Sequence, residues 1–245
     1  TNTTERVSVD SGGGEANGTS VGPSLSADGN LVAFYSYADN LVSGDNNGWA
    51  DVFVHNRTTG ATSRVSVSSA SAQANADSYN ADIAAGGRFV AFESNANNLV
   101  TGDNNSKSDI FVHDRRTGVT TRVSVVDMGG PPPPPISPGA SRGKRELLFE
   151  GNGASQSPSL SADGRYVAFS SFADNLVVED RNGVADIFVH DRQTGTTRRV
   201  SVRSSGAEAN GDCEAPAISG DGRYVAFSSC ADNLTDDAID AIAAV

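Results

Sequence analysis

The chain has 245 residues, enough for one large domain, and its 30 acidic side chains against 18 lysines and arginines give a net charge of −12. This charge repels nucleic acid phosphates and anionic membrane surfaces, so neither is an expected partner. Glycine is abundant, and no apolar run reaches the roughly 18 residues of a membrane span. The composition therefore indicates an all-β protein without a membrane span.

A repeat organises the sequence from end to end. The tetrapeptide RVSV begins at Arg6, Arg64, Arg122 and Arg199, and the third interval is longer than the first two, which are equal. A proline-rich insertion at residues 126–149 accounts for the extra length. We therefore expect a single domain over residues 1–245, with repeats at about 10–67, 68–125, 126–202 and 203–245 after an N-terminal strand at 1–9.

Each repeat contains four strand candidates in the same order. In the first repeat they are PSLS from Pro23, LVAFYS from Leu31, DVFV from Asp51, and a last segment that ends in RVSV. The second and third candidates are apolar at nearly every position, which is typical of strands covered on both faces of their sheet. Four short antiparallel strands per repeat, buried between neighbouring repeats, predict the blades of a β-propeller.

The two ends of the chain predict how such a ring would close. Residues 1–9, TNTTERVSV, match TGTTRRVSV at residues 194–202, which is the last strand of a blade. The C-terminal repeat carries DAIAAV where the other repeats have the third strand. We expect the N-terminal strand to complete the last of about four blades and leave no open edge. Whether four blades form the full ring or part of a larger one stays open.

Residues 158–195, PSLSADGRYVAFSSFADNLVVEDRNGVADIFVHDRQTG, resemble the TolB-like β-propeller repeats of secreted and periplasmic bacterial proteins. Those repeats carry a Pro-x-x-Ser-x-Asp-Gly-(Arg/Lys) turn followed by an apolar strand. The sequence departs from the pattern at Gly86, which replaces the turn aspartate, and at the C-terminal residues. The resemblance implies the fold, but such propellers serve as binding platforms, assembly parts and accessory domains of enzymes.

The loop between the second and third strands has the composition of a calcium site. Aspartate, asparagine and aspartate recur there at relative positions 1, 3 and 7, a spacing that can turn several oxygens inward. The predicted ligands are Asp45, Asn47, Asp51, Asp103, Asn105, Asp109, Asp180, Asn182 and Asp186. The shorter fourth copy, with Asp236, Asp237 and Asp240, is not expected to bind metal. The same residue types also dominate polar turns, so a loop without metal is the alternative.

The remaining candidates for chemistry are few. His55, His113 and His190 occupy the same place in three repeats, which favours a structural role over catalysis. No nucleophile elbow, zinc spacing or phosphate-binding glycine loop occurs, so we expect no enzymatic activity. Trp49 is the only tryptophan, and it either stacks on a ligand or covers its own loop.

Two cysteines give an indication of the cellular compartment. Cys213 and Cys230 stand at equal distances from the predicted turn at Asp221 and Gly222, so they are expected to face each other across a hairpin. A disulfide there would indicate an oxidising compartment, with two free thiols as the alternative. We expect an extracellular or cell-surface location, with the periplasm as the other candidate.

These observations predict a non-catalytic, calcium-stabilised extracellular β-propeller that serves as a binding or structural module. The partner would be a protein or a glycan. One alternative is a subunit of a surface filament or adhesin, in which the insertion or an open end contacts the next copy. Another alternative is an accessory or catalytic propeller of a polysaccharide-degrading enzyme.

Overall fold

The computed structural model describes residues 2–127, 150–235 and 242–244, and all fifteen secondary-structure elements there are β-strands. The proline-rich insertion, apart from its first two residues, and the fourth polar loop lie outside the described residues. Nowhere in the described ranges is there a helix that could cross a membrane.

The strands form four separate antiparallel sheets, one in each predicted repeat. Blade 1 contains β1 (Ser20–Leu25), β2 (Leu31–Ser36), β3 (Asp51–Asn56) and β4 (Thr62–Arg64). Blade 2 contains β5 (Ser78–Ile83), β6 (Phe89–Ser94), β7 (Asp109–Asp114) and β8 (Val119–Arg122). Blade 3 contains β9 (Ser155–Leu160), β10 (Tyr166–Ser171), β11 (Asp186–Asp191) and β12 (Thr196–Arg199). Blade 4 has three described strands, β13 (Cys213–Ile218), β14 (Val225–Ser229) and β15 (Ile242–Ala244).

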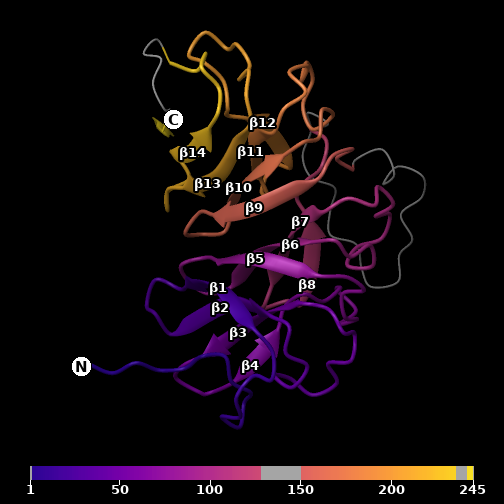
Figure 1. Ribbon diagram of the computed structural model, residues 1–245, viewed down its shortest axis with the longest axis vertical. Helices are drawn as coiled ribbons and strands as arrows, with labels where there is room; N and C mark the ends of the chain where they lie inside the picture. The colour runs from indigo at the N-terminus through magenta and orange to yellow at the C-terminus, as the bar shows by residue number, and fades with distance from the viewer. Residues whose placement is uncertain (1, 128–149, 236–241, 245) are drawn as a thin grey trace.

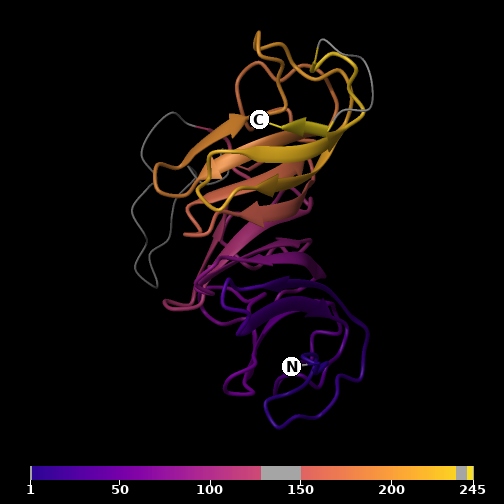
Figure 2. The same ribbon diagram turned by 90° about the vertical axis from the view of Figure 1, so that its left-hand side faces the viewer.

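The blades stack face to face along the long axis of the molecule, as Figures 1 and 2 show from two sides. Between blades 1 and 2, Val52 and Val54 pack against Phe92 and Phe111 of the next sheet, and all four side chains are buried. Equivalent apolar clusters join blade 2 to blade 3 and blade 3 to blade 4. This packing explains the apolar runs of the second and third strands, because a blade inside the stack has no solvent face.

The predicted closure of the ring is not confirmed. The N-terminus lies at the blade 1 end of the stack and blade 4 lies at the opposite end (Figure 1). The N-terminal segment lies against blade 1, where the Thr62 hydroxyl donates a hydrogen bond to the Val9 carbonyl at 2.5 Å. The sheet of β13, β14 and β15 has no described fourth strand.

The predicted disulfide is wrong, because Cys213 and Cys230 are not bonded to each other. Near the turn, Ile218 pairs with Val225 as the sequence predicts, but a bulge between Glu214 and Ala217 shifts the register by one residue. Cys213 therefore faces Ser229 and is buried, whereas Cys230 is exposed beyond the end of the strand. The structure thus removes the disulfide as a reason to expect an oxidising compartment.

Candidate functional site

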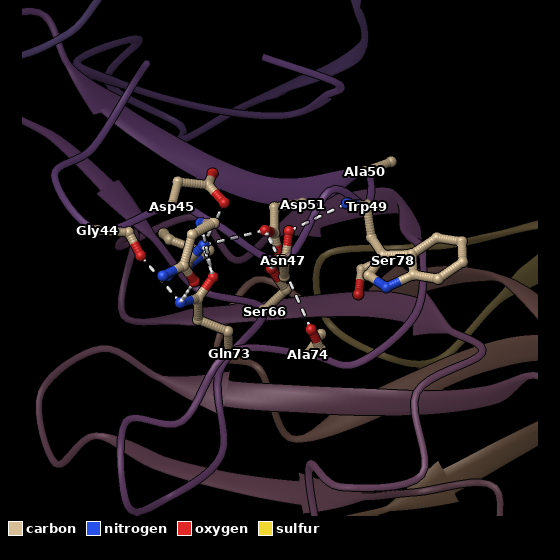
Figure 3. A network of polar contacts seen from close by, with 12 residues as sticks. Gly44, Asp45, Asn47, Trp49, Ala50, Asp51, Ser66, Gln73, Ala74 and Ser78 are labelled. Carbon is tan, nitrogen blue, oxygen red and sulfur yellow. Dashed lines mark hydrogen bonds and ion pairs between the residues drawn. The ribbon is translucent and has the colours of Figure 1, made fainter. Parts of the chain in front are cut away.

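The polar loops form three equivalent clusters, one at the start of each third strand. In blade 1 the buried carboxylate of Asp51 accepts hydrogen bonds from the Ser66 hydroxyl and from the side-chain amide of Asn47, the latter at 2.7 Å. The Asn47 carbonyl oxygen accepts a hydrogen bond from the backbone N–H of Trp49 at 3.0 Å. Figure 3 shows these contacts. The predicted ligands are therefore brought together, but they bind one another.

An arginine occupies the centre of each cluster. In blade 1, Nη1 of Arg64 lies 2.8 Å from Oδ1 of Asp45 and 3.1 Å from Oδ2 of Asp51. The same nitrogen donates a hydrogen bond to Oε1 of Gln73 at 3.0 Å. Gln73 lies in the hairpin that leads into blade 2. The guanidinium therefore joins the loop, the third strand and the next repeat. It is also the first residue of the RVSV tetrapeptide, so every repeat carries one.

Blades 2 and 3 hold one more carboxylate than blade 1. Nη1 of Arg122 lies 3.2 Å from Asp103, 3.3 Å from Asp109 and 3.4 Å from Glu150. In blade 3, Nη1 of Arg199 lies 3.0 Å from Asp180, 3.3 Å from Asp186 and 2.7 Å from Glu208. Glu150 and Glu208 stand where blade 1 has the neutral Gln73. One positive charge thus faces three carboxylates in blades 2 and 3 but only two in blade 1.

The arrangement does not fit a calcium ion. Calcium needs six to eight oxygen ligands, and here a guanidinium already occupies the centre of each cluster. The Asn47, Asn105 and Asn182 amides turn their nitrogen toward the aspartate at the start of the third strand, at 2.7–3.0 Å. In the described residues of these loops, only Oδ2 of Asp45 and Oδ2 of Asp103 are buried carboxylate oxygens without a hydrogen-bond partner. In the described ranges, no group of three or more His, Cys, Asp or Glu side chains is placed so that it could hold a metal ion. The predicted calcium role therefore finds no support in these donors.

Burial, reinforced by neighbouring carboxylates in blades 2 and 3, raises the pKa values of these aspartates. Burial, together with the nearby Asp109 carboxylate, raises the pKa of Asp103 to about 7. Burial and the Asp186 carboxylate raise the pKa of Asp180 to about 6. Burial also raises the pKa of Asp51, against the opposing effects of Ser66 and Arg64. Because Asp103 titrates near neutral pH, a proton on this group offsets part of the negative charge that Arg122 leaves unbalanced.

The three histidines are structural, as their periodicity predicts. His55 Nδ1 is hydrogen-bonded to the Thr62 hydroxyl at 2.9 Å, and His113 and His190 make the same contact with Thr120 and Thr197. All three rings are buried between the third and fourth strands. Burial lowers the pKa of each, in the case of His190 to about 4, so they are neutral at physiological pH.

Trp49 lies at the edge of the first cluster without joining it. Figure 3 shows its indole turned away from Asp45, beside Ser78. The ring is one of the exposed large apolar side chains of the chain. Both interpretations from the sequence, a ligand contact and a cover for the loop, stay open.

A groove between the blades is the feature that the sequence did not reveal. It has a volume of about 470 Å³ and is lined by the first strands of all four blades, β1, β5, β9 and β13. Each of these strands carries a bulge whose central residue has a positive φ, at Gly22 (64°), Asn80 (48°), Ser157 (56°) and Ala215 (51°). In three of the blades a proline follows the positive-φ residue within the bulge, which is tolerated because the first strand is the edge of its sheet.

Asp82 is the one charged residue among the described residues that line this groove. Its Oδ1 accepts a hydrogen bond from the Ser24 hydroxyl of blade 1, and its Oδ2 accepts one from the Leu160 N–H of blade 3, both at 2.7 Å. The carboxylate thus connects three blades. Its counterparts in the other blades are Ser24, Ser159 and Ala217, and this difference between repeats is the sequence signal that could have indicated it.

Comparisons with known proteins give structural likeness only. No protein-family model and no curated protein matches the sequence. Among solved structures, TolB from Acinetobacter baumannii is 14% identical, with a TM-score of 0.48 over 86% of this chain and 38% of that chain. A putative TolB from Agrobacterium tumefaciens is 16% identical, with a TM-score of 0.48 over 86% of this chain and 54% of that chain. The β-propeller domain of the Trilobed protease from Pyrococcus furiosus is 14% identical, with a TM-score of 0.43 over 87% of this chain and 49% of that chain. The chain thus spans between about two fifths and just over half of these proteins.

Replacement of the central arginine should destabilise the protein. In Arg64→Gln the carboxylates of Asp45 and Asp51 lose their cation while they stay buried, so we expect a loss of about 3 kcal/mol in the free energy of unfolding. Urea denaturation measures this loss, with Arg116→Gln, at an exposed arginine, as the matched control. An effect no larger than that of the control would contradict the assigned role.

The raised pKa of Asp103 predicts a pH dependence that one variant isolates. Because the folded pKa lies above the unfolded value, the charged form destabilises the fold, and this destabilisation is relieved as the pH falls from about 8 to 5. The buried histidines act in the opposite direction over this range, so the test compares the wild type with Asp103→Asn. We expect the wild type to gain on the order of 2 kcal/mol relative to the variant between pH 8 and 5. A difference that does not change with pH would show that Asp103 does not titrate there.

Calcium should have little effect on stability. A bound ion at about a hundred times its dissociation constant would raise the melting temperature by roughly 5 °C or more. Because an arginine already fills each loop, we expect nearly equal melting temperatures in millimolar calcium and after exhaustive chelation. A calcium-dependent increase of the full size would show that the loops rearrange to admit the ion.

Proposed function

We propose that the chain is a non-catalytic binding module that holds its ligand in the groove between the first strands of its blades. The observation that carries the proposal is the groove itself, where the same strand of every blade lines one volume of about 470 Å³. Ligand sites usually have a few placed polar groups, and here four strands converge around the carboxylate of Asp82.

The chemistry of the lining supports binding over catalysis. General acid–base work on a substrate usually needs two groups whose pKa values differ, and Asp82 is the one titratable side chain among the described residues of the lining. The histidines are buried between strands of their own blades and bind threonine hydroxyls. These contacts leave them without a role in the groove.

Three prolines and one carboxylate set the polarity of the groove. Pro23, Pro158 and Pro216 have no N–H, and the carboxylate of Asp82 brings a negative charge. With the net charge of −12, this lining favours a ligand rich in donors, such as a basic peptide or a hydroxylated glycan. The extracellular location expected from the sequence stays a prediction.

Blocking the groove should abolish binding. Pro23 is exposed and lines the groove, so Pro23→Trp fills it without removing a buried contact. We expect the wild-type protein to bind at least one class of probe on peptide and glycan arrays. The Pro23→Trp variant should no longer bind that class. Val178→Trp, at a side chain that is 87% exposed and outside the groove, is the matched control. Binding that survives in Pro23→Trp would place the ligand elsewhere, and no binding to either array would contradict the proposal for these ligand classes.

A further inference from the structure

Three of the chain's five tyrosines meet at the junction between blades 1 and 2. The ring of Tyr35, at the end of β2, lies edge-on to the ring of Tyr37, with centroids 6.4 Å apart and an interplanar angle of 70°. It makes a similar contact with Tyr79 of β5, with centroids 5.4 Å apart and an angle of 82°. Tyr35 packs on the apolar cluster between the two blades, whereas Tyr37 is 55% exposed. This tyrosine cluster is thus held by the core on one side and open to solvent on the other.

A carboxylate and an indole accompany the tyrosine cluster. Asp77 lies two residues before Tyr79, and its Oδ1 accepts a hydrogen bond from the Ala50 N–H at 2.8 Å. Burial, together with a hydrogen bond to Asp77, raises the pKa of the Tyr79 hydroxyl, which therefore stays protonated and donates to the carboxylate. Trp49 precedes Ala50, and Figure 3 shows its indole beside Ser78, the residue before Tyr79. The indole is 46% exposed, so aromatic rings and a negative charge are accessible in one place.

The other two junctions inside the chain have different side chains at these positions. Between blades 3 and 4, Oδ1 of Asp212 accepts a hydrogen bond from the Ala185 N–H at 2.9 Å, so the carboxylate by itself is part of the scaffold. The counterparts of Tyr35, Tyr37, Trp49 and Tyr79 are Ser170, Phe172, Val184 and Glu214 at that junction, and Glu93, Asn95, Lys107 and Gln156 between blades 2 and 3. The combination of several aromatic rings with a carboxylate is therefore particular to the first junction.

Elsewhere the protein covers aromatic rings with its own arginines. The guanidinium carbons of Arg88 and Arg192 lie 4.6 Å and 4.3 Å from the ring centroid of Phe89. That of Arg165 lies 4.7 Å from the ring centroid of Tyr166. Such contacts are favourable because the face of an aromatic ring attracts a cation. In the described ranges, no arginine or lysine lies over a ring of the tyrosine cluster in this way.

We propose that the tyrosine cluster, together with Asp77 and Trp49, binds an arginine side chain of a basic peptide. A guanidinium is planar, stacks on aromatic faces and donates several N–H groups to carboxylate oxygens, so one side chain uses both parts of the site. The net charge of −12 attracts such a peptide. A neutral glycan has no positive charge to interact with the ring faces or with this net charge.

The tyrosine cluster adjoins the groove but is separate from its lining. A Cβ atom at Gly22, which lines the groove, would lie 3.0 Å from Cε1 of Tyr35. Asn80, which follows Tyr79 in β5, also lines the groove. A peptide bound in the groove can therefore reach the tyrosine cluster, but the inference does not require it to do so. The two proposals can fail separately.

Tryptophan fluorescence tests the inference, because Trp49 is the only tryptophan in the chain. We expect titration with a hexa-arginine peptide to change its emission and to reach saturation. Tyr37→Ala removes the most exposed ring of the tyrosine cluster and should raise the dissociation constant about three- to tenfold. Phe172→Ala, at the same position in blade 3 and 49% exposed, should leave it unchanged. A wild type whose emission does not respond, or a Tyr37→Ala variant that binds as tightly as Phe172→Ala, would overturn the proposal.

Two further comparisons test the role of the guanidinium. Asp77→Asn should weaken binding of hexa-arginine about tenfold, whereas Asp212→Asn, which alters the equivalent carboxylate at a junction without tyrosines, should have little effect. Hexa-lysine has the same charge but no planar group that stacks, so it should bind at least about threefold more weakly. Equal affinities for the two peptides would reject recognition of arginine. A response to maltohexaose without a response to hexa-arginine would assign the site to a glycan and overturn the proposal.

Anisotropy of a fluorescein-labelled hexa-arginine peptide separates this site from the groove. Binding that is lost in Pro23→Trp but not in Tyr37→Ala would place the peptide in the groove and reject the inference. Binding that is weakened in Tyr37→Ala but kept in Pro23→Trp would support the inference and show that the groove does not hold this peptide.

Discussion

The burial of each blade against the next is the constraint on which the rest of the structure depends. Second and third strands that are apolar on both faces cannot face water on either side, so a single sheet of this sequence has no stable isolated form. Stacking satisfies this requirement for blades 2 and 3, which are covered on both faces. On the outer face of blade 1, Phe34 and Phe53 are buried in a cluster within the blade itself, whereas Leu25 is 60% exposed.

The polar loops serve the same packing. Arg64 reaches from the end of β4 to the loop of its own blade and to Gln73 of the next repeat, so its guanidinium fixes the position of one blade relative to its neighbour. A built-in cation has an advantage over a bound one, because its presence does not depend on the concentration of metal outside. Its disadvantage is that a single charge cannot balance three carboxylates, and burial together with the neighbouring Asp109 carboxylate raises the pKa of Asp103.

Much of the fold was predictable from the sequence, because the repeat makes each strand visible several times. LVAFYS, predicted as the second strand, is β2 residue for residue, and DAIAAV contains the third strand of blade 4. The sequence match between residues 1–9 and 194–202 predicts a fourth strand, but residues 2–8 form no strand in the structure and the predicted closure is not confirmed. The pairing of the cysteines was predicted wrongly because a β-bulge shifts the register of the hairpin. The bulge contains Ala215, which has a positive φ and precedes Pro216. An alanine in the sequence gives no indication of a positive φ.

The loops show why candidate sites are harder to predict than strands. Asp45, Asn47 and Asp51 are close in sequence and were found together, whereas Arg64 reaches them only because β3 and β4 pair. The arginine is the first residue of the RVSV tetrapeptide and was therefore recognised as part of the repeat. Its position among the carboxylates depends on the pairing register of β3 and β4, which the sequence did not reveal. The groove was not predicted for the same reason, because the residues that line it come from four segments far apart in the chain.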